Sequence, residues 1–208
     1  MVEEQLVPFG DVLGHALGNI PVYSCHVSNV GVALSQLEAH SEVSCSIWCG
    51  MKLYYGCKYQ CVEFARRWLI HALGVTFGDV VMAFEIFDMQ SAFSVREEAP
   101  IPWLSVNNGS AARPEIGSAL IWTAGGQFEG TGHVAIITEV GDDHVNIAEQ
   151  NVFHVAWPDG QNYARSLSLI HDTATGGYTI MDPRLVEGTR ISGWKTLADF
   201  ERSPIPIG

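Results

Sequence analysis

The sequence predicts an α+β domain in which N-terminal helices pack on an antiparallel sheet. The first half of the chain shows the helical repeat of apolar residues, whereas the second half shows short apolar runs separated by turn residues. With 208 residues, 47% of them hydrophobic and 16% charged, the chain can bury a substantial core. We therefore expect a single domain over residues 1–208.

Two segments of the first half have clear helical character. In residues 60–73 the apolar side chains recur with the spacing of one buried helical face, and Gly74 follows as a helix-ending residue. A second helix is predicted over residues 80–89, with Asp79 as its N-cap. This second segment is apolar nearly all round, so we expect it to be mostly buried.

The strands are expected mainly in the second half. Residues 98–117 are rich in Pro, Asn, Gly and Ser and are predicted to be an irregular connection. Residues 25–50 resemble a variable loop in which residues 32–39 could form one short helix. The predicted strands, the first of them only a strand end, are 22–24, 119–122, 132–140, 144–149, 165–170 and 178–181.

Charge and composition exclude several classes of partner. The formal net charge of −12 argues against nucleic acid and against an anionic membrane surface, because both require a basic footprint. No run approaches the length of a membrane span, and the acidic N-terminus lacks a secretory pattern. Five cysteines without an export signal indicate a reduced, cytoplasmic protein. Two pairs of them have CxxxC spacing, which is wider than the usual spacing of zinc ligands, so no metal is expected.

Cys61 is the candidate nucleophile. It lies at the junction of a loop and the predicted helix 60–73, where unpaired backbone N–H groups and the helix dipole favour the thiolate. A small buried hydrophobe is the ordinary interpretation of such a cysteine. The helix start, and a second motif that offers a base and an orienting group, favour the catalytic interpretation.

The second motif is a predicted hairpin that carries His133 and Glu149. If its connection has an odd number of residues, such as 140–142, then position 139 pairs with 143 and His133 lies opposite Glu149 on the same face. A two- or four-residue loop would place the two side chains on opposite faces. A carboxylate beside an imidazole fixes its tautomer and frees the other ring nitrogen to act on a thiol. Taken singly, both residues could equally be solvated side chains at strand ends.

The full motifs carry a family resemblance. YQCVEFARRWL at residues 59–69, TGHVAIITEV at 131–140 and IAEQNV at 147–152 closely resemble the amidase domain of the glutathionylspermidine synthetase/amidase and trypanothione synthetase family, which are papain-like cysteine amidases of the CHAP type. The resemblance runs over most of the chain and implies the papain-like CHAP fold. It also implies a small-molecule substrate, a glutathione–polyamine conjugate, and no cofactor.

The resemblance implies a mechanism and a set of site residues. Cys61 would attack the amide carbonyl of glutathionylspermidine, with trypanothione as a further candidate substrate. His133 would move the proton, and Glu149 would orient His133. A thioester would form, and water would release glutathione and spermidine. The oxyanion would be held by the Cys61 N–H and the Gln60 side chain. The positions that the resemblance implies for substrate contacts are Gln60, Arg66, Val80, Val81, Met82, Ala83 and Asn151.

Two departures from the family pattern matter. Val81 stands where some relatives have glycine, which would narrow the pocket. The ATP-dependent ligase domain of the bifunctional relatives is absent from residues 1–208, so ligation is not expected of this chain. Two other functions stay open: a CHAP-type peptidoglycan amidase or endopeptidase, and a non-catalytic module in which Cys61 is a redox-sensitive thiol.

Overall fold

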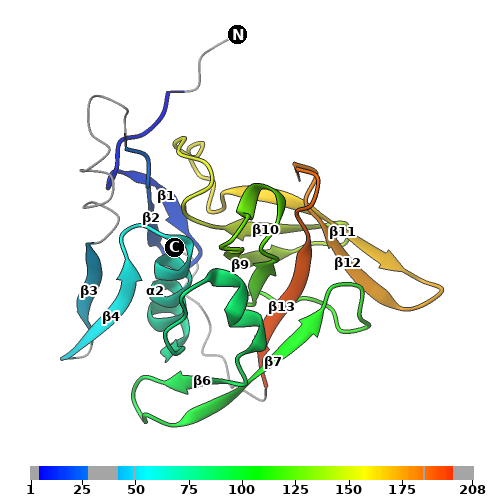
Figure 1. Ribbon diagram of the computed structural model, residues 1–208, viewed down its shortest axis with the longest axis horizontal. Helices are drawn as coiled ribbons and strands as arrows, with labels where there is room; N and C mark the ends of the chain where they lie inside the picture. Colours follow the sequence, from blue (N-terminus) through cyan, green and yellow to red (C-terminus); the bar gives the residue numbers. More distant parts are fainter. Residues whose placement is uncertain (1–4, 28–41, 49, 185, 199–208) are drawn as a thin grey trace.

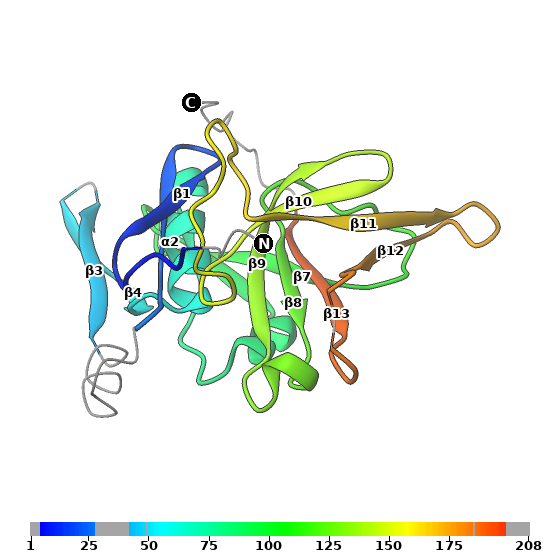
Figure 2. The same ribbon diagram turned by 90° about the horizontal axis from the view of Figure 1, so that it is seen from above.

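A curled antiparallel sheet dominates the computed structural model, which describes residues 5–27, 42–48, 50–184 and 186–198 (Figures 1 and 2). The main sheet has nine strands in the order β12-β11-β10-β9-β8-β13-β7-β6-β5, and two hairpins, β1–β2 and β3–β4, form separate small sheets. The strands are β1 Val12–Ala16, β2 Ile20–Tyr23, β3 Val43–Trp48, β4 Met51–Cys57, β5 Val75–Thr76, β6 Ser91–Ser94, β7 Pro100–Asn107, β8 Ala119–Trp122, β9 His133–Val140, β10 His144–Ala148, β11 Arg165–Asp172, β12 Gly177–Met181 and β13 Ile191–Leu197.

Part of the main sheet closes on itself. Residues 108–110, which follow β7, exchange backbone hydrogen bonds with Tyr178 of β12, and the Asn108 side chain bonds both backbone groups of Ile180. This contact joins the edge strand β12 back to the β7 side of the sheet. The enclosed space is filled by apolar side chains from the inner face: Leu120, Trp122, Ala135, Ile137, Val145, Ile147, Leu167, Leu169, Ile180, Ile191 and Trp194.

Helix α2, Cys61–Leu73, packs between the main sheet and the two hairpins (Figure 2). It begins after Gln60 and ends at Gly74, whose φ of 68° is in the left-handed region that glycine adopts without strain. Its buried face includes Phe64, Trp68 and Leu69. The predicted helix 60–73 is confirmed. Its apolar residues recur on one face of the helix, and that face packs against the surface of the sheet.

The expected fold class is wrong in its helical part. Within the described residues α2 is the only α-helix, and the structure is mostly β rather than N-terminal helices packed on a sheet. The predicted helix 80–89 is reduced to a short 3₁₀ helix, η1, Ala83–Asp88, and a second one, η2, spans Gly126–Phe128. The possible helix at 32–39 lies outside the described residues.

Local hydrogen bonds explain the lost helix. The Glu85 carboxylate accepts from the backbone N–H groups of Val81 and Met82, at 2.8 and 3.1 Å, and so the first helical turn begins at Ala83, three residues later than expected. Asp79, the expected N-cap, instead pairs with Arg66. Val81 is 83% exposed, so the segment is not the buried helix that its apolar composition indicated.

Residues 98–117 were expected to be irregular, but β7 occupies 100–107. Its two prolines, Pro100 and Pro102, lie opposite β6, and from Trp103 onward the strand pairs with β13. β3 likewise falls in the predicted loop 25–50. The remaining predicted strands are confirmed with small shifts of their ends.

No helix among the described residues is long and apolar enough to cross a membrane.

Candidate active site

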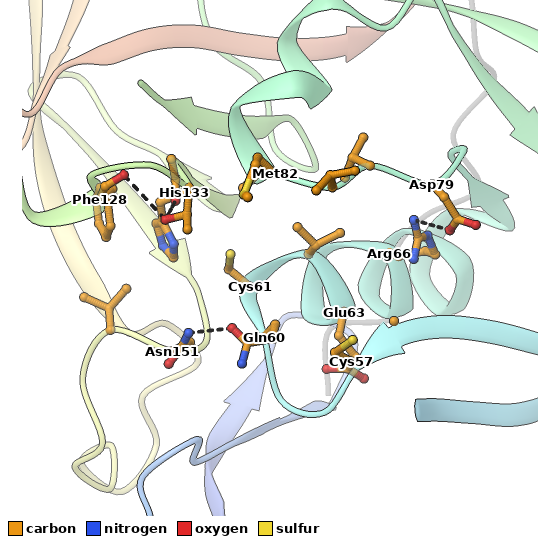
Figure 3. Close-up of a pocket in the computed structure, with 18 of the residues that line it drawn as sticks. Cys57, Gln60, Cys61, Glu63, Arg66, Asp79, Met82, Phe128, His133 and Asn151 are labelled. Atoms are coloured by element: carbon orange, nitrogen blue, oxygen red, sulfur yellow. Dashed lines mark hydrogen bonds and ion pairs between the residues drawn. The ribbon is translucent and has the colours of Figure 1, made fainter. Parts of the chain in front are cut away.

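A cavity of about 730 Å³ lies between the start of α2, the segment before η1 and the mouth of the closed part of the sheet. Figure 3 shows Cys61 and His133 facing each other at one end, and Arg66 with Asp79 at the other. The residues that line it are Tyr54, Gly56, Cys57, Gln60, Cys61, Val62, Glu63, Arg66, Asp79, Val80, Val81, Met82, Ala83, Gln127, Phe128, Thr131, Gly132, His133, Asn151, Val152 and Phe153.

Cys61 is the first residue of α2, and its side chain is buried at the cavity floor. Burial by itself raises the pKa of the thiol. Attraction to His133, a hydrogen bond with its ring and backbone hydrogen bonds from Val134 and Val62 outweigh burial and hold the pKa below its ordinary value. The site therefore favours a thiolate at Cys61.

His133 lies between Cys61 and Glu149. Its Nε2 is 2.8 Å from Glu149 Oε2, and both side chains are almost fully buried. Because Nε2 faces the carboxylate, the other ring nitrogen, Nδ1, is left to serve the thiol. Cys61, His133 and Glu149 thus form a continuous hydrogen-bonded line from the helix to the sheet.

The hairpin that carries His133 and Glu149 has a different register from the expected one. Val140 pairs with Val145, so four residues separate the paired positions, which by itself would put His133 and Glu149 on opposite faces. The pairing then shifts, because β9 has one extra residue, Thr138, opposite the step from Asn146 to Ile147.

This β-bulge restores the common face. Beyond it Ile147 pairs with Ile137 and Ala148 with Ile136, so Glu149 is a diagonal neighbour of His133 rather than its direct partner. The Thr138 hydroxyl donates to the Asn146 carbonyl at 3.1 Å and holds the bulge. The expected common face is confirmed, but the register that predicted it is wrong.

Aromatic rings and a glycine fix the position of His133. Phe128 stacks on its ring with centroids 4.6 Å apart, and Trp122 lies 5.2 Å away. Gly132 has a φ of 63°, and a Cβ there would lie 2.7 Å from Phe84 Cβ and 2.8 Å from the Trp122 carbonyl oxygen. Only glycine allows β9 to begin this close to the segment of η1.

His133 and Glu149 each stabilise the charged form of the other. Burial lowers the pKa of His133, but the Cys61 thiolate and Glu149 outweigh it and raise the pKa to about 9. Burial raises the pKa of Glu149, but the hydrogen bond from His133 and attraction to Arg165 lower it to about 2. The geometry therefore stabilises an imidazolium between two anions.

Gln60 and Asn151 flank the thiol. Asn151 Nδ2 donates to Gln60 Oε1 at 2.6 Å (Figure 3). Gln60 Nε2 donates weakly to Cys25 Sγ at 3.5 Å. Asn151 has a φ of 62°, a conformation that asparagine tolerates better than most residues. These contacts fix the orientation of the Gln60 amide, at the residue that precedes α2.

Arg66 supports the far wall of the cavity. Its guanidinium donates to the carbonyl oxygens of Tyr55 at 2.6 Å and Gly78 at 3.0 Å and pairs with Asp79 at 3.3 Å. Arg66 is 3% exposed. The structure therefore gives it an anchoring role for the segment that leads into residues 80–83, all of which line the cavity.

A buried polar network anchors the backbone on both sides of the site. Glu63, Arg67 and Gln150 are buried and bonded to one another, with distances of 2.7 to 3.4 Å. Gln150 Oε1 also accepts from the backbone N–H of Tyr23. Because Gln150 follows Glu149 directly, the network ties the end of β10 to α2 and β2. Arg67 thus has a structural role rather than a place in the cavity.

The sequence reasoning missed Arg165 and Asp182. Arg165 donates to both oxygens of Glu149, at 2.5 and 3.3 Å, and to Asp182 at 2.5 Å. Arg165 lies in phase with the buried Leu167 and Leu169 of β11. A charged residue in an inward-facing strand position was the signal available in the sequence.

No group of three or more His, Cys, Asp or Glu side chains in the described part of the chain is arranged to hold a metal ion.

A thiol at a helix N-terminus, joined to an imidazole and a carboxylate from a neighbouring sheet, is the arrangement that cysteine hydrolases use for nucleophilic catalysis. Residues 52–151 match the model of one protein family, the CHAP domain, and this range contains Cys61, His133 and Glu149. The resemblance to the CHAP amidase family that the motifs indicate is thereby confirmed.

Three curated proteins are similar along nearly the whole chain. The bifunctional glutathionylspermidine synthetase/amidase of Escherichia coli (strain K12) is 40% identical over 202 residues, which are 97% of this chain and 31% of that protein. Trypanothione synthetase of Crithidia fasciculata is 35% identical over 95% of this chain and 28% of that protein. Glutathionylspermidine synthase of the same organism is 28% identical over 92% and 27%. The chain thus spans about a third of the length of these relatives.

Proposed function

We propose that this chain is a cysteine amidase that hydrolyses glutathione–polyamine amides, releasing glutathione and spermidine from glutathionylspermidine, with trypanothione as a second candidate substrate. The observation that carries the proposal is the buried line of hydrogen bonds from Cys61 through His133 to Glu149 at the cavity floor. The substrate class is suggested by relatives whose names include glutathionylspermidine and trypanothione.

The chemistry follows from these three side chains. The Cys61 thiolate attacks the amide carbonyl carbon, forming a C–S bond and a tetrahedral oxyanion. As the C–N bond breaks, the His133 imidazolium gives its proton to the departing amine. Water then attacks the thioester with His133 as base, the C–S bond breaks, and glutathione leaves. Glu149 holds the imidazole in one orientation and stabilises its charged form throughout.

The oxyanion is held at the start of α2. The Cys61 backbone N–H belongs to the first turn of the helix, where N–H groups have no intrahelical acceptor. The Gln60 amide, which Asn151 holds through its oxygen, supplies the second donor once its NH₂ group turns from Cys25 Sγ toward the substrate oxygen. Two such donors in a site that excludes water stabilise the developing negative charge.

The cavity suits a substrate that carries both signs of charge. Glutathione contributes carboxylates and a polyamine contributes ammonium groups. Arg66 lines the wall beside the exposed carboxylate of Asp79, so both kinds of partner are within one cavity. Val80, Val81, Met82, Ala83 and Asn151 form the remaining substrate contacts of the proposal, with Val81 exposed at the rim.

Mass spectrometry of the reduced protein incubated with glutathionylspermidine tests the proposal. We expect glutathione and spermidine in equal amounts, together with a transient mass increase on Cys61 from the thioester. Cys61→Ala should abolish release while its thermal unfolding and circular dichroism stay unchanged. Cys45→Ala, which removes an exposed cysteine outside the cavity, is the matched control and should retain activity.

Absence of release by folded, reduced protein would overturn the proposed substrate class. In that case cell-wall peptides are the next substrates to test, and their cleavage by the same protein would favour the CHAP-type peptidoglycan function. Equal release by the Cys61→Ala variant would overturn the assignment of the nucleophile.

A further inference from the structure

Four neighbouring strands bring one charged or polar side chain each to the same end of the sheet. His133 begins β9, Glu149 follows β10, Arg165 begins β11 and Asp182 follows β12. These strands are consecutive neighbours in the antiparallel sheet, so the start of one strand lies beside the end of the next at this end of the sheet. Cys61 reaches His133 from the helix that packs on β9.

The strand register makes each contact a diagonal one. Ile147 pairs with Arg165, so Glu149, two residues further along β10, is diagonal to Arg165 on the same face. Ser168 pairs with Met181, which sets Asp182 opposite Leu167 and diagonal to Arg165. Diagonal neighbours lie about 7–8 Å apart at Cβ, a span that long side chains such as Arg and Glu can bridge.

Arg165 fills the gap between two buried carboxylates. Its Nε and Nη2 donate to Oε1 and Oε2 of Glu149, and its Nη1 donates to Asp182 Oδ2. Arg165, Glu149 and Asp182 are 7%, 4% and 5% exposed. The other oxygen of Asp182 accepts from the backbone N–H of Arg184 at 3.0 Å, so Asp182 is itself held in place.

The two-point contact has a consequence for His133. A carboxylate with only one partner can rotate about its terminal bond, whereas two parallel N–H donors from a planar guanidinium fix its plane. Glu149 Oε2 is then held toward His133 Nε2. The charge of Arg165 also keeps this carboxylate ionised in a place from which water is excluded.

From this geometry we infer that Arg165 is a positioning residue of the proposed amidase site, which fixes the orientation and the charge of Glu149 and acts through it on His133 and Cys61. The role of Arg165 in catalysis rests on the proposed function. Its effect on the Cys61 thiolate does not, because that effect can be measured without a substrate. The charged or titratable groups that face this line are Cys61 from α2, His133 from β9, Glu149 after β10, Arg165 from β11, Asp182 after β12, and Cys25, which interacts with both Cys61 and Glu63.

The test is the pH dependence of Cys61 alkylation by iodoacetamide, read at the peptide level by mass spectrometry, so it needs no substrate. Without Arg165, the pKa of Glu149 should rise by about 1–3 units, the amount by which a neighbouring arginine lowers that of a carboxylate. Once protonated, Glu149 stabilises the His133 imidazolium less, and the Cys61 thiolate is then less stable as well. In Arg165→Met the acid limb of the alkylation profile should therefore move to higher pH by about one unit or more.

Three further variants sharpen the test. Arg165→Lys keeps a charge but not the planar fork, so its limb should lie between those of the wild type and Arg165→Met. Arg165→Met combined with Asp182→Asn removes the guanidinium together with the carboxylate that would be left unpaired, and it decides the question if the single variant does not fold. Arg190→Met, at an exposed arginine next to β13, is the matched control and should keep the wild-type profile.

A folded variant without Arg165 whose acid limb matches the wild type would overturn the inference, even if its turnover had fallen. A shifted limb in a protein that does not hydrolyse glutathionylspermidine would uphold the inference and reject the proposed substrate. If the wild type hydrolyses glutathionylspermidine but the Arg165 variants have the alkylation profile of the wild type, the proposed substrate is supported and the inference about Arg165 is overturned.

Discussion

Replacement of Glu149 by glutamine tests the link between the buried carboxylate and the proposed chemistry. The carboxylate accepts from His133 on one side and from Arg165 on the other. A glutamine amide has one acceptor and one donor end, so it must turn its NH₂ group toward either His133 or Arg165. Either choice sets two donors against each other in a buried place.

The expected loss of stability follows from the pKa of Glu149. That pKa is about 2 against an ordinary 4.5, a difference of about 2.5 units, which at about 1.4 kcal/mol per unit is roughly 3.5 kcal/mol. A depressed carboxyl pKa stabilises the fold above about pH 4.5, and this contribution is lost as the pH falls toward 2. At pH 7 the variant should unfold about 7–14 °C below the wild type, since 1 kcal/mol corresponds to about 2–4 °C in a chain of this size.

The same substitution should also lower the rate of catalysis. Loss of an orienting carboxylate in a comparable serine triad costs about 10⁴ in kcat, so we expect a fall of roughly 10²–10⁴ in glutathionylspermidine hydrolysis. Thermal unfolding from pH 7 to pH 3 and steady-state kinetics provide the measurements. Glu97→Gln, at an exposed turn, is the matched control and should change neither.

Two results would refute this reasoning about Glu149. Turnover equal to the wild type would mean that another group orients His133. A difference in melting temperature that does not narrow toward pH 3 would mean that the ionised carboxylate does not stabilise the fold.

Three other substitutions probe the rest of the site. His133→Ala should slow alkylation of Cys61 at pH 6 by about a hundredfold or more, because a thiol of ordinary pKa is almost entirely protonated there; peptide-level mass spectrometry measures this, and an unchanged rate would exclude a His133-stabilised thiolate. Gly132→Ala should lower the melting temperature by several degrees in differential scanning fluorimetry, since its Cβ would overlap the residues that face it. An unaltered melting curve would contradict that overlap. Arg66→Met should raise KM for glutathionylspermidine about tenfold as the wall it anchors loosens, with kcat less affected. A KM equal to that of the wild type would remove Arg66 from the substrate-binding role.

The helix and the two strands that carry the candidate catalytic residues could be predicted because each has its own pattern of apolar residues in the sequence. The helix from Cys61 to Leu73 has its own apolar repeat and its own terminating glycine, and the strands that carry His133 and Glu149 have their own apolar runs. Each of these signals arises within about a dozen residues, so no knowledge of the remaining chain is needed to interpret it.

The common face of His133 and Glu149 was predicted correctly from an incorrect register. The turn pairs Val140 with Val145, which alone would separate the two side chains, and the extra residue Thr138 brings them back together. A bulge of one residue leaves almost no mark on the pattern of apolar residues when both faces of the strand are buried, as they are in β9.

The helical part of the fold class was wrong for a related reason. Residues 80–89 are apolar because they pack beside the site on several sides, and the same composition would suit a buried helix. Residues 100–107 contain two prolines and look irregular, yet they form a strand because β13 pairs with their second half. In both segments tertiary contacts outweigh the local preference.

The sequence by itself determined which cysteine, histidine and carboxylate are the candidate catalytic residues, the helix that presents the thiol and the family to which their motifs point. Only the tertiary structure decided the closed sheet, the bulge that aligns His133 with Glu149, and the contact of Arg165 with both Glu149 and Asp182. The physical reason is that helix starts and apolar repeats depend on neighbours in the chain. Strand register and buried ion pairs depend on residues that meet only after the sheet has formed.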